Sequence, residues 1–354
     1  MSRFAKGLLI YIVIFVLLAA VALGLLSAYL RAYEDSRSTT FVSRYLAACA
    51  EGELSYSWGA SLASLDRRFQ TEEEIRDWVC ARLEKATFRE LRSDKPEEKL
   101  YGIFDEEGVC LEKLTLRQEG EGRWGFTGWV VTGEECGVDA YTQTLDLLVP
   151  SDYTVELGEK TLDDSFVSDS RAVYSLLEPF QGHLMKQPYL KRYQVGPYLA
   201  GAEVRVLDAD GREVAEEDRN EFYYLQNCSA KETARLHEFA LEYLDVYLPY
   251  AGDLERYGIM HWDALYRMIV HGGDLENRLV QARQGFGFGN TNAIEVLSDE
   301  LRLTSKLDSG HYLVDLGYRT ETVGLHGPVE EDNQVRLLIV EQEGELLVEA
   351  MYNY

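Results

Sequence analysis

The residues that could carry acid–base chemistry are densest at His261-Trp262-Asp263, followed by Tyr266. A helix beginning at Trp262 would place Asp263 and Tyr266 three residues apart on one face. A carboxylate and a phenol so placed could transfer a proton, with His261 as a further titratable group. Asp263 also suits the first turn of a helix for structural reasons, because the helix dipole favours an acid there. The sequence therefore leaves a catalytic and a purely structural interpretation open.

Other motifs with chemical meaning are weak. Asp208-Ala-Asp-Gly211 resembles the start of a calcium loop, but the twelfth position is Arg219 rather than the required glutamate, so a hairpin turn is favoured. The G-x-S-x-G signature of serine hydrolases is absent. The remaining histidines are scattered along the chain: His183, His237, His271, His311 and His326. We therefore expect neither a metal site nor a bound cofactor.

The cysteines number five, so at least one stays unpaired within a monomer. They are Cys49, Cys80, Cys110, Cys136 and Cys228, and no two form a C-x-x-C pair. A disulfide between Cys110 and Cys136 is one possibility, since both lie in sequence rich in strands. Free thiols are the simpler interpretation, and the pairing stays open.

The element that must position everything else is the apolar stretch from Gly7 to Leu30, which contains no charged residue. As a helix it would be about 36 Å long, enough for a bilayer core of roughly 30 Å. A cleaved signal peptide is the alternative, but its apolar region normally has only about 7–15 residues. We expect an uncleaved transmembrane helix that contacts the lipid bilayer through residues 7–30.

The flanking charges indicate orientation. Arg3 and Lys6 precede the helix, and acidic residues accompany Arg31 and Arg37 beyond it. We expect a single-pass protein of the cell membrane, with residues 1–6 in the cytoplasm and the C-terminal ectodomain outside.

Small residues recur within the apolar stretch. Ala20, Gly24 and Ala28 are each four residues apart, so they lie on one face of the helix. This spacing lets two membrane helices approach closely, so a homodimer through this face is possible.

The net charge of the chain is -26. So acidic a surface repels phosphate backbones, which argues against nucleic-acid binding. With 46% hydrophobic residues, the chain has the composition of globular domains with real cores.

The pattern beyond the membrane predicts an α+β fold, because helical periodicity precedes strand-like alternation twice. Residues 31–38 read as a short polar stalk. Helices are expected over 39–50, from the capping box at Thr71, from the capping box at Ser229, over 262–270 and over 275–283. Strands are expected over 100–104, 109–116, 124–131, 294–304, 312–323, 334–341 and 345–352. The predicted domains are a first α+β domain over 31–140, a β-rich connecting module over 141–228 and a second α+β domain over 229–354.

The order of helices followed by a long curved sheet resembles the cone-shaped fold of the nuclear transport factor 2-like superfamily. The closing hairpin from Val335 to Tyr352 is similar to the last hairpin of that family. The stretch from Tyr101 to Val131 is similar to the membrane-proximal domain of this superfamily in some penicillin-binding proteins. The resemblance implies two cone-like domains, at about 38–135 and 229–354. Enzymes of the family work inside the cone, with a general base and an oxyanion donor.

A membrane-anchored, extracytoplasmic binding or assembly protein of a bacterial cell envelope is the function that we expect, without catalysis. The 23 tyrosines suit recognition of a protein or glycan partner where they are exposed, although the simpler interpretation is that they line cores and domain seams. The alternative is an enzyme whose cone pocket carries out proton transfer or hydrolysis, with its acid–base pair in the second cone domain.

Overall fold

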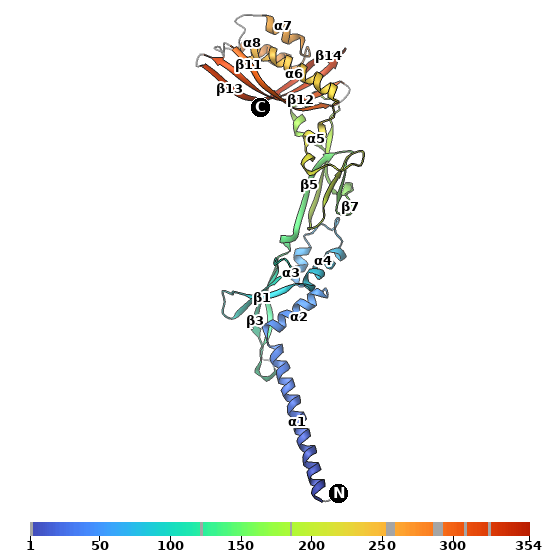
Figure 1. Ribbon diagram of the computed structural model, residues 1–354, viewed down its shortest axis with the longest axis vertical. Helices are drawn as coiled ribbons and strands as arrows, with labels where there is room; N and C mark the ends of the chain where they lie inside the picture. The colour runs from blue at the N-terminus through green and yellow to red at the C-terminus, as the bar shows by residue number, and fades with distance from the viewer. Residues whose placement is uncertain are drawn as a thin grey trace. The chain divides into compact units, whose positions relative to one another are not determined.

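The chain is described by a computed structural model covering residues 3–120, 123–184, 186–252, 259–285, 293–307, 310–324 and 327–354. Its fold is mixed α+β, with an N-terminal apolar helix and several antiparallel sheets (Figure 1). Two compact units make up the chain. Unit 1 comprises Met1–Leu145 and Val195–Ala202, and unit 2 comprises Asp146–Gln194 and Glu203–Tyr354.

Unit 1 begins with α1 (Arg3–Asp35), which is long and apolar enough to cross a membrane. The helix continues past Leu30, so the polar stalk expected over 31–38 is wrong for its first five residues. Tyr33 explains the extension, because its ring packs on Phe126 and holds the last turns of α1 against the folded part of the unit. Three further helices follow: α2 (Ser38–Ala50), α3 (Tyr56–Leu62) and α4 (Glu72–Glu84).

A four-stranded antiparallel meander completes unit 1, in the order β1-β2-β3-β4. The strands are β1 (Thr87–Leu91), β2 (Glu98–Phe104), β3 (Cys110–Glu119) and β4 (Gly128–Cys136). Helix and sheet side chains bury one core between them, including Trp58, Val79, Tyr101 and Leu114. The strand expected to begin at Trp124 begins instead at Gly128. Trp124 lies in a 3₁₀ turn with φ 67°, a left-handed conformation that interrupts strand pairing.

Short elements follow the meander, most of them in unit 2, and β5 and β9 contribute residues to both units. Two small sheets, ordered β10-β6-β7 and β5-β9-β8, contain the strands of this region. Their bounds are β5 (Thr142–Pro150), β6 (Thr154–Leu157), β7 (Lys160–Thr161), β8 (Val167–Val173), β9 (Tyr189–Leu199) and β10 (Val204–Leu207). Asp208 accepts the amides of Asp210 and Arg212, which confirms the turn expected after β10. The short helix α5 (Glu221–Leu225) follows.

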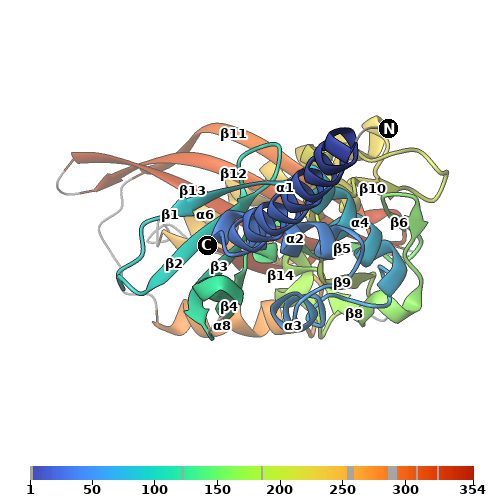
Figure 2. The same cartoon turned by 90° about the horizontal axis from the view of Figure 1, so that it is seen from below.

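The second half of unit 2 repeats the order of helices and then a meander. Its helices are α6 (Ala230–Ala251), α7 (Ile259–Arg267) and α8 (Asp274–Gly285). Its strands are β11 (Ala293–Lys306), β12 (His311–Gly324), β13 (Gly327–Gln342) and β14 (Glu345–Asn353), hydrogen-bonded in that order. The long strands bend along their length (Figure 2). Register shifts at Val296/Ser298 and Leu301/Leu303 of β11 account for part of this curvature, since a bulge bends its strand.

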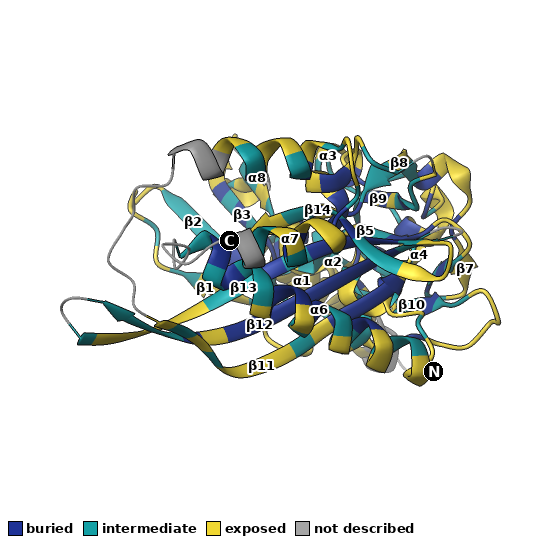
Figure 3. Cartoon of the chain, turned by 90° about the horizontal axis from the view of Figure 1, so that it is seen from above, coloured by how far each residue is buried: buried dark blue, intermediate teal, exposed yellow. Residues whose placement is uncertain are grey.

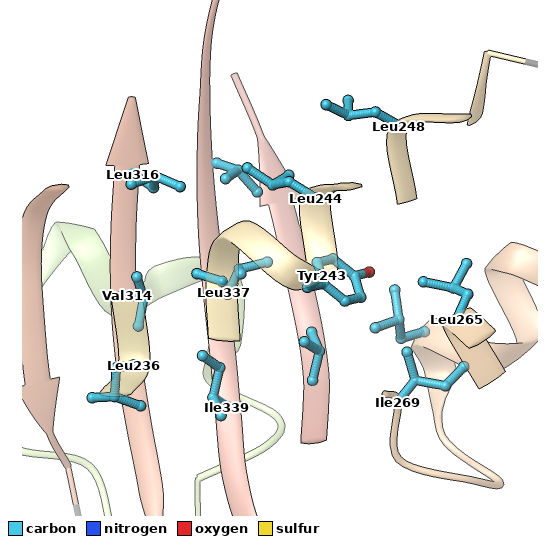
Figure 4. Packing of buried hydrophobic residues seen from close by; sticks show 14 of the residues in the cluster. Leu236, Tyr243, Leu244, Leu248, Leu265, Ile269, Val314, Leu316, Leu337 and Ile339 are labelled. Carbon is cyan, nitrogen blue, oxygen red and sulfur yellow. The ribbon is translucent and has the colours of Figure 1, made fainter. Parts of the chain in front are cut away.

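The four-stranded sheet of unit 2 is covered on both faces. Tyr243 and Leu244 of α6 pack against side chains of β12 and β13 such as Leu316 and Leu337 (Figure 4). On the other face Leu177 joins a cluster with Leu313, Leu338 and other sheet residues. The centre of β12 is consequently buried, whereas β11, at the sheet edge, is mostly exposed (Figure 3).

The sequence patterns located most of these elements. The strands predicted in the second half match β11–β14 within a few residues, except that β13 begins seven residues earlier. Both predicted capping boxes are confirmed, at Thr71 with Glu74 and at Ser229 with Glu232. The sequence missed β1 and α3, which are too short to show a period.

Candidate functional site

The most distinctive feature of unit 1 is an aromatic cluster shared by α1 and the β3–β4 hairpin. Tyr29 and Tyr33 come from the last turns of α1, and Trp124 and Phe126 come from the connection between β3 and β4. The ring centroids of Tyr29 and Phe126 are 5.3 Å apart, those of Tyr33 and Phe126 5.7 Å, and those of Tyr29 and Trp124 6.1 Å. Trp124 remains 47% exposed and Tyr33 50% exposed, so the outer surface of the cluster is open.

Hydrogen bonds fix the same junction just beyond the cluster. The indole Nε1 of Trp129, on β4, donates to the carbonyl oxygen of Ser36 at 2.7 Å. The hydroxyl of Ser36 donates to the carbonyl oxygen of Tyr33 at 2.6 Å. Arg44 of α2 forms an ion pair with Asp35 at the end of α1. The apolar helix is therefore joined to the folded part of unit 1 by specific contacts rather than by a free linker.

A pocket of about 660 Å³ opens at this junction. Its walls come from the α1–α2 connection and from all four strands of the unit 1 sheet. Three basic side chains line it, Arg37, Lys99 and Arg117, together with the carboxylates of Glu90 and Glu97. We call this cavity the membrane-proximal pocket.

The polar groups of the membrane-proximal pocket differ in their partners. The Lys99 ammonium lies 3.3 Å from the Glu90 carboxylate, which also accepts the Tyr101 hydroxyl at 3.1 Å. The Tyr101 hydroxyl lies 2.8 Å from the Ser38 hydroxyl, and burial raises the pKa of this phenol. No ion pair to Arg37 or Arg117 occurs within the described part of the chain. Two guanidinium groups therefore line the pocket without a carboxylate partner there.

A second arrangement with chemical potential lies inside the core of unit 1. Glu112 of β3 is completely buried and accepts the Tyr45 hydroxyl at 2.7 Å and the Trp58 Nε1 at 3.0 Å. Burial raises the pKa of Glu112 to about 7, even though both of these hydrogen bonds lower it. Burial and the nearby Glu112 carboxylate raise the pKa of Tyr45. Glu112 and Tyr45 thus form a buried, hydrogen-bonded pair of titratable groups.

Ser55 connects this buried pair with a smaller pocket of about 270 Å³. Its hydroxyl is buried and lowers the pKa values of both Tyr45 and Glu112, although it makes no hydrogen bond of regular geometry to either. Ser55 lines the pocket, and Glu112 does not. The carboxyl group therefore has both oxygens occupied and is not at the pocket wall.

The residues proposed from sequence for acid–base chemistry all lie on α7 in unit 2, which includes Ile259 and so starts earlier than the expected Trp262. His261 is half-buried, whereas Asp263 and Tyr266 are exposed. The Tyr266 ring packs on His271, with centroids 4.1 Å apart, and on Trp262 at 5.7 Å. The structure thus brings Tyr266 together with two aromatic rings, and it gives no hydrogen bond between Asp263 and Tyr266, both of which are described.

Some tyrosines of unit 2 are buried in its core, and others are exposed at its surface. Tyr243 and Tyr247 stack in the core of unit 2 with centroids 5.7 Å apart and an interplanar angle of 9°. Tyr247 also lines a pocket of about 320 Å³ together with Arg278 and Tyr352. Tyr223, Tyr352 and Tyr354 are 43–48% exposed.

The small residues of α1 have room for a partner. Ala20 and Gly24 are exposed, and a Cβ built on Gly24 would meet no atom within 4 Å.

The five cysteines are all free thiols.

The chain is similar to a solved structure of another protein. It is described as "Ntf2 like protein involved in plasmid conjugation", and it is 10% identical, with 75% of each chain covered and a TM-score of 0.25. No family model and no curated protein matches the chain. A TM-score of this size does not establish a shared fold, so the architecture rests on the chain's own helices and strands.

Sequence reasoning missed the aromatic cluster, the membrane-proximal pocket and Glu112. The first two combine segments about ninety residues apart, which no local pattern connects. Glu112 did leave a signal, because it alternates with Leu114 and Leu116 along β3, and all three are buried. A glutamate at an apolar position of an alternating strand indicates a buried acid.

Proposed function

We propose that this chain is a membrane-anchored binding or assembly protein on the extracytoplasmic side of a bacterial cell envelope, and that it acts without catalysis. The observation that carries the proposal is the junction of α1 with the rest of unit 1, where aromatic packing and the Trp129–Ser36 hydrogen bond join an apolar helix to a folded domain. Such a junction holds unit 1 at the membrane in a defined orientation. A component that recruits partners at a surface depends on that orientation.

The topology and domain division belong to this proposal. Residues 1–6 are assigned to the cytoplasm and residues 7–30 to the bilayer, in keeping with Arg3 and Lys6 before the span. The ectodomain division at residues 140 and 228 stays a prediction. We also propose that the two stretches of helices followed by a four-stranded meander are copies of one cone-like fold, which their shared element order supports.

The partner that we propose is a protein or glycan of the envelope. Exposed tyrosines of unit 2, such as Tyr223 and Tyr352, offer contact area with little loss of side-chain entropy on binding. The strongly acidic composition argues for a partner other than nucleic acid. A second copy of the chain is a further partner, through Ala20, Gly24 and Ala28.

The proposal is tested by crosslinking in intact membranes. A photoreactive amino acid replaces Tyr223 or Tyr352 in the full chain, and crosslinked products are identified after detergent extraction. We expect a defined envelope partner from at least one position. A matched chain with the same probe at Tyr243, which is buried, should give none. Alkaline phosphatase fused after Tyr354 should be active, because that end is assigned outside, and an inactive fusion would contradict the topology.

The helix contact is tested separately with Gly24→Leu, which fills the close-approach face. We expect it to weaken any crosslinked dimer, whereas Leu23→Ala, one residue away and off the small-residue face, should not. An unchanged dimer in Gly24→Leu would exclude this face.

A second candidate function, an enzyme, is favoured by one observation: Glu112 and Tyr45 form a buried, hydrogen-bonded pair next to Ser55, which lines a pocket. A carboxyl group whose pKa lies at about 7 is suited to general acid–base chemistry. The enzyme alternative predicts that Glu112→Gln abolishes the cellular phenotype while the folded protein accumulates normally in the membrane. For the pair proposed from sequence, Asp263→Asn and Tyr266→Phe should do the same, and an intact phenotype in all three variants would exclude both sites.

A further inference from the structure

We propose that the membrane-proximal pocket binds the phosphate group of a bilayer phospholipid. This inference rests on the proposed membrane anchoring and goes further by assigning a ligand class to the pocket. Three features support it: the depth of the aromatic cluster, the position of the pocket next to it, and the charges that line the pocket.

The aromatic cluster has the composition and exposure of a membrane-interface belt. Tyrosine and tryptophan concentrate at that level because their rings are amphipathic. Tyr29 and Tyr33 lie at the end of the apolar helix, and Trp124 reaches the same level from the β3–β4 hairpin. Trp124 adopts a left-handed backbone, unusual for a large residue, and its indole is nearly half exposed. With α1 spanning the bilayer as proposed, lipid surrounds it at this level and the exposed surface of the cluster faces the interface.

The membrane-proximal pocket begins immediately beyond this belt. Ser36 and Arg37 line it, three and four residues after Tyr33. At about 1.5 Å per residue, the pocket begins roughly 5 Å further from the bilayer centre than the Tyr33 backbone. The head-group layer is about 5–7 Å thick on each side of the hydrocarbon core. A belt at the edge of the hydrocarbon core therefore places the pocket at the depth of lipid phosphates.

The charges of the pocket suit a phosphate. The Arg37 and Arg117 guanidinium groups have no ion-pair partner among the described residues, and Lys99 is paired with Glu90. Guanidinium groups bind phosphate through paired, charge-assisted hydrogen bonds. The lining carries three basic and two acidic residues, whereas the chain has 61 acidic and 35 basic residues. The pocket is thus a basic site on an acidic protein, at the one depth where phosphate is abundant.

The experiment is native mass spectrometry of the delipidated full chain in detergent, titrated with phosphatidylglycerol or with diacylglycerol of the same acyl chains. We expect one phosphatidylglycerol to bind more tightly than all others and diacylglycerol to show no such site. Arg37→Gln with Arg117→Gln should weaken that first binding step at least tenfold. Arg212→Gln, which removes a 75% exposed arginine of unit 2, should leave it unchanged. Equal binding of both lipids, or an unaffected double variant, would overturn the proposal.

Free phosphate is distinguished in the same experiment. Millimolar inorganic phosphate should leave the bound lipid in place. If inorganic phosphate displaces it completely, the pocket is a site for the free ion and the lipid assignment is wrong. Circular dichroism of the double variant confirms that any loss of binding is not a loss of fold.

The depth of the belt is measured independently in liposomes that contain a lipid with a spin-labelled head group. The label should quench tryptophan fluorescence of the full chain, and Trp124→Phe should reduce the quenched fraction. Trp262→Phe, in unit 2, should leave the quenched signal as it is. Flotation of every variant with the liposomes tests the anchor alone. Chains that float but show no contribution from Trp124 refute the lipid site, whereas chains that do not float refute the proposed function.

Discussion

Replacing Glu112 by glutamine should make unit 1 more stable at neutral and alkaline pH. Glu112 is completely buried between the Tyr45 hydroxyl and the Trp58 indole. An ionised carboxylate at that position keeps both hydrogen bonds but loses its hydration. Glutamine has nearly the same shape, can accept from Trp58 through its oxygen, and can donate to Tyr45 through its amide. The substitution thus removes the charge and keeps both contacts, with the Tyr45 hydroxyl as acceptor rather than donor.

The size and sign follow from the pKa of this carboxyl group. Burial raises it from an ordinary value of 4.5 to about 7. The folded state then binds the proton more tightly than the unfolded chain, so the free energy of unfolding falls as pH rises from 4.5 to 7 and is level above that range. A difference of 2.5 pH units corresponds to about 3 kcal/mol, as an order of magnitude. Glu112→Gln should therefore gain up to about 3 kcal/mol over the wild type at pH 8 and little at pH 4.

The assay is urea unfolding of the full chain in detergent, followed by tryptophan fluorescence between pH 4 and pH 8. Four of the five tryptophans lie in unit 1, so the signal reports mainly on that unit. The control is Glu135→Gln, which removes a carboxylate that is 72% exposed and paired with Lys113 on the surface. That variant should unfold with the same pH dependence as the wild type.

Two results would refute the reasoning. One is a wild-type stability of unit 1 that does not change between pH 4.5 and pH 7. The other is a Glu112→Gln protein that is less stable than the wild type at pH 8, which would mean that the ionised carboxylate stabilises the core. Trp58 fluorescence gives a further check, because it should titrate with a midpoint near pH 7 in the wild type and not in the variant.

Three further predictions concern the stability of unit 1. Arg68 and the amide of Gly196 hold the pKa of Asp66 at about 2, below its ordinary value of 3.8. The contribution of Asp66 to stability is therefore present at neutral pH and is lost as pH falls from 3.8 towards 2. In the same urea assay, Asp66→Asn should lower the free energy of unfolding at pH 7 by about 1–2 kcal/mol and have little effect at pH 2. Gly137→Ala should lower the free energy of unfolding by about 1–3 kcal/mol, and with it the urea midpoint, because its Cβ would lie 2.3 Å from the carbonyl oxygen of Cys110. An unchanged midpoint would mean that β3 can shift there. Thr71→Ala should cost about 1 kcal/mol by thermal unfolding, and Thr71→Ser should restore most of it, because serine also caps a helix.

The sequence could predict those parts of the fold that depend on local patterns. The capping boxes at Thr71 and Ser229 mark helix starts, because side chain and backbone meet within four residues. The sequences of β11–β14 alternate between apolar and polar residues, or are continuously apolar, over many positions, and this pattern predicts strands. The predicted end of the helix at Leu30 is five residues too early, because the end of α1 depends on a contact between distant segments and not on a local pattern. Its last turn is polar in sequence, and its helical state is supported by the contact of Tyr33 with Phe126, a residue of a distant hairpin.

The candidate sites were harder to predict, since each depends on the meander of unit 1. The sequence singled out Asp263 and Tyr266 because they are close along the chain, but proximity along a helix does not bury a group. Trp124 read as part of a strand, whereas its left-handed backbone turns the ring towards Tyr29. Glu112 is the instructive exception. Its alternation with Leu114 and Leu116 along β3 indicates an inward-facing side chain, although a glutamate is rarely buried.

The junction of α1 with the rest of unit 1 is more ordered than an anchor alone requires. A tether holds a domain near a membrane equally well through a flexible linker, and such linkers are short of aromatic residues. Here, instead, the residue that follows α1, Ser36, accepts a hydrogen bond from Trp129, and Trp124 of the β3–β4 connection packs on Tyr29. Ordering these residues costs conformational entropy, which the aromatic contacts must offset. The order is best explained if the orientation of unit 1 at the membrane matters for function, as recognition of a lipid phosphate or of a fixed partner would require.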